Sequence, residues 1–203
     1  GNLDLVAGGG INEGLDIFRG MGDGSFNYIE RVGGSRQAAS LAVVDLNVDG
    51  NLDVIAPSLS DNNAVTIVYG MGNLKFEAPQ DITDVGQGPL SIRVFDWGSE
   101  LTLPDKSVVL GPRDGKPDLI VVNSGVIPGP FSSIGPPGIV VLPRQADDED
   151  GTARFGDPIP VARAEQPLDI EIADFDRDGA PDISVVDRSG FFVIYGQAPN
   201  IQS

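Results

Sequence analysis

The chain has 203 residues and a formal net charge of −17, with 30 acidic and 13 basic side chains. This charge argues against nucleic-acid binding, because phosphate contacts need clustered Lys and Arg. The absence of Cys and His excludes disulfides and thiolate metal sites, and it removes the usual general base of catalysis. The 27 Gly and 16 Pro residues favour turns over long helices, and no apolar run approaches the about 20 residues of a membrane span.

The N-terminal part of the chain predicts short strands. An apolar run, 4-DLVAGG-9, is followed by 15-LDIFRGMGDGSF-26, which alternates before a Gly-rich hairpin turn. No Lys–Ser/Thr pair follows these glycines, which disfavours a phosphate-binding loop. The run 36-RQAASLAVV-44 fits a helix locally, but its two counterparts later in the chain alternate and are rich in β-branched residues. We therefore expect a strand there.

The first complete repeat unit is built around the acidic segment 45-DLNVDGNLD-53. The run 40-SLAVVD-45 leads into it, 53-DVIAPS-58 follows it, and 64-AVTIVYGMGNLKF-76 ends in a Gly-rich turn and a Phe. We call the nine-residue segment an Asp loop and number its positions one to nine. Oxygen-bearing side chains stand at every second position, Gly stands at position six and Asp at position nine. This pattern predicts either a solvated turn or a cage for a hard cation.

The same order returns twice. Strands are expected at 90–96, 118–123 and within 138–155, and again at 168–174, 182–187 and 191–196. The last Asp loop, 174-DFDRDGAPD-182, is complete, whereas the one from Asp96 to Asp118 is split by 98-GSELTLPDKSVVLGP-112. Further insertions are predicted at 124–137 and at 146–151, whose run 147-DDED-150 is typical of a solvated turn. The Pro- and Gly-rich loop 127-IPGPFSSIGPPG-138 is typical of a surface connection, with a contact surface as the alternative.

The closing residues of the successive Asp loops define a repeat. Asp4, Asp53, Asp118 and Asp182 are separated by 49, 65 and 64 residues. Four short strands per unit at this period predict an all-β fold made of antiparallel β-propeller blades. We treat 1–203 as a single propeller region with approximate units 1–44, 45–95, 96–173 and 174–203. About three complete units and partial ones are too few to close a ring, which indicates an incomplete propeller or a fragment.

The pattern DxNxDGxxD between strands, followed by VxYGxGxxxF, resembles the FG-GAP/VCBS repeats of calcium-binding β-propellers, a repeat class also found in integrin α-subunits. The residues that carry the resemblance are 45–53 with 65–76, 174–182 with 192–196, and 14–26 for the Gly-rich half. The resemblance implies Ca²⁺ in the strand-to-strand loops at one face of the propeller.

Calcium prefers six to eight oxygen ligands from carboxylates, amides and main-chain carbonyls. The candidate ligands of the first complete loop are Asp45, Asn47, Asp49, Asp53 and the carbonyl of Asn51. Those of the last loop are Asp174, Asp176, Asp178, Asp182 and the carbonyl of Ala180. Gly50 and Gly179 permit the sharp turn, and Gly50 is expected to have a positive φ. Two Ca²⁺ sites are therefore expected.

A third site is possible in the split loop. Its candidate ligands are Asp96, Asp114, Lys116 (through its carbonyl) and Asp118, while position three is left to Ser99, Glu100 or Asp105 folding back. Gly1, Asn2 and Asp4 match positions six, seven and nine of a further loop whose earlier ligands are absent from the sequence. We expect that site to be empty or built differently.

Other interpretations of the loops are weaker. An EF-hand needs an acidic residue at position twelve and flanking helices, but Ala56 and Val185 stand there and the flanks are strands. The solvated turn without metal remains open. Trp97, the only Trp, is expected to pack between blades, with exposed stacking on a sugar as the alternative.

The sequence favours a non-catalytic module in which Ca²⁺ fixes the loops and the blades form a rigid platform for a protein or glycan partner in adhesion. No carboxylate pair outside the Asp loops indicates catalysis. The alternatives are a structural subunit of a larger surface assembly, in contact with other blades, and the propeller part of a polysaccharide-processing enzyme. Calcium loops favour an extracellular, cell-surface or periplasmic location. Direct membrane insertion is not expected.

Overall fold

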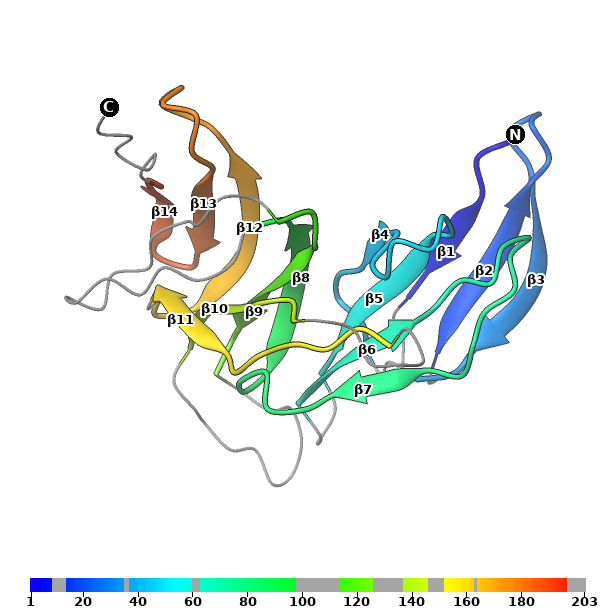
Figure 1. The fold of residues 1–203 in the computed structure, drawn as a ribbon, viewed down its shortest axis with the longest axis horizontal. Coiled ribbons are helices and arrows are strands. Elements are labelled where there is room, and N and C mark those ends of the chain that lie inside the picture. The colour runs from blue at the N-terminus through cyan, green and yellow to red at the C-terminus, as the bar shows by residue number, and fades with distance from the viewer. Residues whose placement is uncertain are drawn as a thin grey trace.

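The computed structural model describes residues 1–8, 14–34, 37–59, 63–97, 114–125, 137–145, 152–162 and 164–196. Within these residues the chain is all-β, and its strands form four antiparallel sheets of three or four strands (Figure 1). We call these sheets blades 1 to 4 in chain order. No helix that could cross a membrane occurs in the described part of the chain.

The strands of each blade pair with their neighbours in chain order. Blade 1 contains β1 (Leu5–Ala7), β2 (Leu15–Gly20) and β3 (Phe26–Val32). Blade 2 contains β4 (Ala42–Val44), β5 (Asp53–Ser58), β6 (Ala64–Val68) and β7 (Gln80–Ile82). Blade 3 contains β8 (Pro89–Phe95), β9 (Asp118–Asn123), β10 (Gly138–Leu142) and β11 (Ile159–Ala162). Blade 4 contains β12 (Pro167–Ala173), β13 (Asp182–Asp187) and β14 (Gly190–Ile194).

The blades follow the predicted repeat. β4, β8 and β12 lead into the Asp loops, and we call them inner strands; β4 and β12 both contact β8. Among the described residues, blade 1 has no inner strand and blade 4 has no fourth strand after β14. The blades succeed one another along an arc, with blades 1 and 4 at its two ends and no ring closed within the described residues (Figure 1).

The strand predictions at 53–58, 118–123 and 182–187 are confirmed as β5, β9 and β13. β5 and β9 are buried along their whole length, because their two faces pack against the preceding and the following blade. This explains why the sequences of β5 and β9 are nearly continuous apolar runs. The helical alternative for 36–44 is wrong within the described residues, where β4 forms and 37–41 are not helical.

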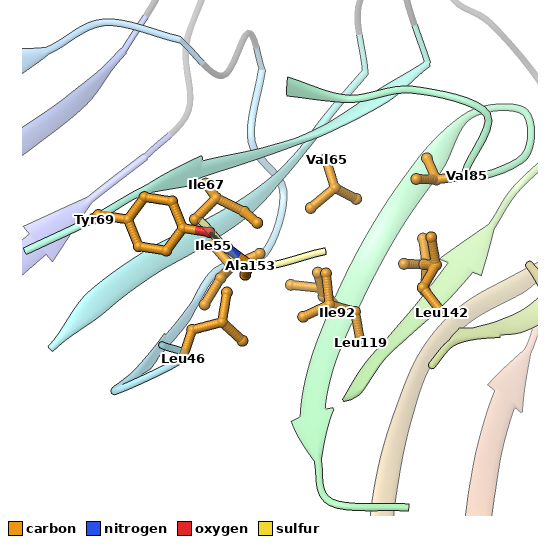
Figure 2. Close-up of a cluster of buried hydrophobic side chains, with 11 residues drawn as sticks. Leu46, Ile55, Val65, Ile67, Tyr69, Val85, Ile92, Leu119, Leu142 and Ala153 are labelled. Carbon is orange, nitrogen blue, oxygen red and sulfur yellow. Dashed lines mark hydrogen bonds between the residues drawn. The ribbon is translucent and has the colours of Figure 1, made fainter. Parts of the chain in front are cut away.

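The core lies between successive blades in three clusters. The middle cluster joins blade 2 to blade 3 and includes Leu46, Ile55, Ile92 and Leu119 (Figure 2). Figure 2 also shows Tyr69 directed toward blade 3, where its hydroxyl oxygen accepts a hydrogen bond from the Ala153 N–H at 3.0 Å. The stack is therefore held by side chains from both blades at each interface.

The inner strands of blades 3 and 4 also meet through polar side chains. The Ser91 hydroxyl donates to the Asp169 carboxylate at 2.6 Å, and the Arg93 guanidinium lies 3.1 Å from Asp169 and 3.4 Å from Glu171. Asp169 and Glu171 are largely exposed, so these ion pairs contribute little to stability by themselves.

In three units, a glycine stands at the end of β2 or just after β6 or β14. A Cβ added at Gly20, Gly70 or Gly196 would overlap the carbonyl oxygen of Leu3, Leu52 or Pro181 respectively. Each of these carbonyls belongs to position eight of an Asp loop. The Gly-rich turn therefore lies directly against the acidic loop of its own blade.

We predict that Gly70→Ala destabilises the protein by about 1–3 kcal/mol, because the added methyl group must displace the backbone of Leu52. The free energy of unfolding from urea titration measures this. Gly33→Ala is the matched control: no atom lies within 4 Å of its added Cβ, so a change within about 0.5 kcal/mol is expected. Equal effects of the two substitutions would contradict the close approach.

The predicted insertions at 98–112 and 146–151, the latter with its acidic run, lie outside the described residues. So does most of the insertion at 124–137.

Candidate metal-binding loops

The Asp at position one closes each loop by accepting two backbone hydrogen bonds. The N–H groups of positions five and six donate to Asp45 at 3.0 and 2.9 Å, to Asp96 at 3.2 and 2.9 Å, and to Asp174 at 3.1 and 3.1 Å. The backbone then turns through Gly50, Gly115 and Gly179, whose φ angles are 91°, 81° and 90°. The positive φ predicted for Gly50 is confirmed, and it is the conformation in which Gly has no steric cost.

The split loop has the same closure as the intact loops. The N–H of Lys116 donates to Asp114 at 2.9 Å, as those of Asn51 and Ala180 donate to Asp49 and Asp178 at 2.7 Å. The structure therefore places Asp114, Gly115 and Lys116 at positions five, six and seven. The residues considered for position three, Ser99, Glu100 and Asp105, lie outside the described residues.

The Asp at position nine connects the start of its loop to the backbone that follows the third strand-forming run of its unit, β6, β10 or β14. One carboxylate oxygen accepts the N–H of position two, from Leu46 to Asp53 at 2.8 Å, from Trp97 to Asp118 at 2.6 Å and from Phe175 to Asp182 at 2.7 Å. The other oxygen accepts an N–H that follows β6, β10 or β14, from Gly70, Arg144 or Gly196 at 2.8, 2.6 and 2.8 Å. The three carboxylates are buried, so both oxygens need these donors.

Burial makes the charge of these carboxylates expensive. Loss of solvent raises the pKa of Asp118 to about 6, against the opposing hydrogen bonds from Arg144 and Trp97, and the nearby Asp114 and Asp96 carboxylates raise it further. The pKa of Asp53 is raised by the same desolvation. A divalent cation near such a carboxylate would favour its charged form.

Position five behaves differently because it lies at the surface. The Asn51 N–H holds the pKa of the exposed Asp49 carboxyl below its usual range. An ionised Asp49 carboxylate at the surface costs little to keep in the absence of metal.

Three carboxylates of the last loop lie together. One oxygen from each of Asp174, Asp176 and Asp182 lies within 4.8 Å of the others, the only such acidic group of three among the described residues. Asp178 is not part of this group. In the first complete loop, the amide oxygen of Asn47 occupies the place of Asp176 and accepts the Asp49 N–H at 3.3 Å, as Asp176 accepts the Asp178 N–H at 3.1 Å.

The remaining predicted site residues are positioned less directly. Asn51, Lys116 and Ala180 stand at position seven, and their N–H groups donate to the carboxylate at position five. Asp4 accepts the Gly20 N–H at 2.9 Å, so it makes one half of the position-nine contact. Asn2 donates to the Gly20 carbonyl at 3.1 Å.

Sequence reasoning missed the role of Arg144. Its side chain is buried, donates from Nη1 to the Leu46 carbonyl at 2.7 Å, and lies with its guanidinium carbon 5.6 Å from the centre of the Phe155 ring. Arg144 therefore ties the turn of blade 3 to the Asp loop of blade 2. The available signal was that Arg replaces the glycine found at the equivalent position of the other three units.

The prediction that Trp97 packs between blades is confirmed. Trp97 belongs to the buried cluster between blades 3 and 4, and its ring meets Phe95 edge to face with centres 6.0 Å apart. The alternative of an exposed ring that stacks on a sugar is wrong.

Comparison with known families matches the FG-GAP-like repeat over residues 1–56 and 113–185. The matched residues make up more than half of the chain, and the protein belongs to the FG-GAP-like repeat family. FG-GAP repeats often bind Ca²⁺, and the acidic cluster of the last loop has the oxygen donors that this ion prefers. A comparison with curated proteins gave no match.

We predict that Asp182→Asn lowers the free energy of unfolding by about 1–3 kcal/mol in EGTA, because the amide NH₂ would face a backbone donor and leave it unpaired. Asp176→Asn is the matched control, since its amide oxygen still accepts the Asp178 N–H. A change within about 0.5 kcal/mol is expected for it. If Asp182→Asn were neutral in EGTA, the structural role of position nine would be wrong.

Proposed function

We propose that this protein is a calcium-stabilised, non-catalytic β-propeller module that serves as a rigid platform for a protein or glycan partner in adhesion. The observation that carries the proposal is the repeated Asp loop, which has oxygen-bearing side chains at equivalent positions in successive blades. In the last loop, oxygens of Asp174, Asp176 and Asp182 lie within 4.8 Å of one another. The module acts outside the cytoplasm, at the cell surface, in the extracellular space or in the periplasm.

The donor set supports calcium rather than a transition metal. The protein has neither Cys nor His, so the loops offer oxygen ligands only, which suit hard cations. Asp174, Asp176 and Asp182 would hold the ion in the last loop, and Asp45, Asn47 and Asp53 in the first complete one. Bound Ca²⁺ would supply positive charge that offsets the repulsion among these carboxylates.

The platform role is supported by the way the loops are built into the blades. In the first complete loop and in the split loop, the residue at position two, Leu46 or Trp97, belongs to the packing between blades. An ion that orders the loop would therefore stiffen the interface as well. The net charge of −17 further favours partners other than nucleic acid.

We predict that EGTA lowers the melting temperature and that Ca²⁺ restores it. Calcium at about 100 times its dissociation constant adds about 2.7 kcal/mol to the free energy of unfolding for each site. Differential scanning calorimetry measures the shift, and isothermal titration calorimetry measures the number of sites. An unchanged melting temperature with and without EGTA would sink the calcium proposal.

Two protein variants in the same measurement distinguish calcium binding at the last loop from a general effect of negative charge. Asp176→Asn weakens the calcium-induced shift because it removes a negatively charged donor of the last loop. Asp23→Asn removes the same charge from an exposed hairpin turn, so its calcium-induced shift should match that of the unchanged protein. Equal losses in both variants would indicate a general charge effect instead of a site.

A panel of immobilised glycans tests the platform role in the presence of Ca²⁺. Binding without release of shorter sugars supports the proposed module, because no chemistry accompanies recognition. Release of sugar fragments would support the alternative of a polysaccharide-processing enzyme.

A structural subunit of a larger assembly is the second candidate. The side of blade 1 that faces away from blade 2 carries Leu5, Phe18 and Tyr28, which the strand register places in one row. Phe26, the first residue of β3, is also exposed. An exposed apolar face of this kind favours contact with another protein surface.

A further inference from the structure

The turn after β10 sends a side chain into the Asp loop of the neighbouring blade. Arg144 keeps the backbone contact of its position, because its N–H donates to the Asp118 carboxylate at 2.6 Å. Its buried side chain leaves blade 3 and donates from Nη1 to the Leu46 carbonyl of blade 2 at 2.7 Å. The equivalent position in the other three units is held by a glycine, which has no side chain for such a contact: Gly20, Gly70 or Gly196.

The carbonyl that Arg144 contacts lies at the start of a candidate calcium loop. Leu46 stands at position two, and its peptide group joins it to Asn47, the candidate ligand at position three. The N–H of Leu46 donates to the position-nine carboxylate of Asp53 at 2.8 Å. One backbone group of Leu46 is therefore held by its own loop and the other by blade 3. Because a peptide group is planar, the contact with Arg144 also fixes the orientation of the backbone that enters Asn47.

The guanidinium of Arg144 is held in place within blade 3. Its carbon lies 5.6 Å from the centre of the Phe155 ring, which packs against the buried cluster between blades 2 and 3. Such a cation–π contact gains strength where solvent is excluded. Arg144 and Phe155 also pair across a hairpin, in which the Gln145 N–H donates to the Arg154 carbonyl at 2.9 Å. A guanidinium that is already positioned loses little further freedom when it binds the Leu46 carbonyl.

We propose that Arg144 is a positioning residue for calcium binding by the Asp loop of the neighbouring blade. It fixes the peptide group that leads to Asn47, so the loop of blade 2 is ordered before an ion arrives. The calcium affinity of this loop is raised because less conformational freedom remains to be lost on binding. The inference rests on the proposed calcium binding, and a measurement without calcium separates the two.

A second contact joins the same hairpin to blade 2 without touching the Asp loop. The hydroxyl oxygen of Tyr69 accepts the Ala153 N–H at 3.0 Å within the buried cluster (Figure 2). Loss of this hydroxyl loosens the interface between blades 2 and 3 but leaves the Leu46 carbonyl with its donor. Tyr69→Phe is therefore the matched control, because it separates positioning of the loop from the general stability of the interface.

The test is amide hydrogen exchange, read by mass spectrometry, during a calcium titration of the whole chain. Peptides that cover 45–53 and 174–182 give a separate calcium midpoint for each complete loop in one sample. Arg144→Met keeps an unbranched apolar side chain and removes the donor to the Leu46 carbonyl. We expect this variant to raise the calcium midpoint of 45–53 about fivefold or more, while that of 174–182 changes less than about twofold.

Two further variants complete the titration. Arg144→Lys keeps a donor on a long side chain but loses the planar guanidinium, so its midpoint for 45–53 should lie between those of Arg144→Met and the unchanged protein. Tyr69→Phe should lower the melting temperature and leave the midpoint of 45–53 unchanged. Thermal unfolding of every variant verifies that it folds.

The same measurement in EGTA tests the ordering of the loop without an ion. Arg144→Met should speed amide exchange in 45–53 about fivefold or more, because a hydrogen bond from a charged donor is lost. The proposal is overturned if exchange in 45–53 is unchanged in EGTA, if both loops shift equally, or if Tyr69→Phe shifts the midpoint of 45–53 as much as Arg144→Met. If calcium protects neither loop but Arg144→Met still speeds exchange in EGTA, the proposed function fails and the ordering of the loop by Arg144 stands.

Discussion

The carboxylate at position nine of the Asp loop is the contact on which the rest of each blade depends. In blades 2, 3 and 4 it joins the start of the loop to the backbone that follows β6, β10 or β14, and it does so from a buried position. Both oxygens accept backbone N–H groups, so neither the loop nor the turn has an unpaired buried donor there. Only an acidic side chain has two acceptor oxygens and no donor, which explains why Asp recurs at this position.

The same contact connects the loops to the packing between blades. In blades 2 and 3, the position-two N–H that binds position nine belongs to Leu46 or Trp97, whose side chains lie between two blades. Arg144 adds a second connection, because its N–H binds Asp118 while its side chain binds the Leu46 carbonyl of the neighbouring blade. Local loop geometry and the stacking of blades are thus parts of one hydrogen-bonded arrangement.

This arrangement separates two roles that acidic residues have in the loops. Position nine is structural whether or not metal binds, since its oxygens are already engaged with backbone donors. In the two complete loops, positions one and three lie nearer the surface, and in the last loop oxygens of Asp174 and Asp176 lie within 4.8 Å of each other and of Asp182. In an FG-GAP-like repeat protein, calcium would act mainly on these outer positions, and through them on the loop that holds the apolar residue at position two.

The sequence by itself determined the all-β repeat and the bounds of β5, β9 and β13, because an Asp followed by a continuous apolar run is a local pattern. It also assigned Asp114 and Asp118 to positions five and nine across an insertion, since Gly115 between them keeps the turn. The helical alternative for 36–44 arose because propensity over a short window ignores the sheet that β4 joins. Only the tertiary structure decided that Asp53 and Asp118 each join two backbone segments, and that Arg144 reaches the Leu46 carbonyl. These features depend on which distant segments the stacked blades bring together, and no spacing along the chain encodes that.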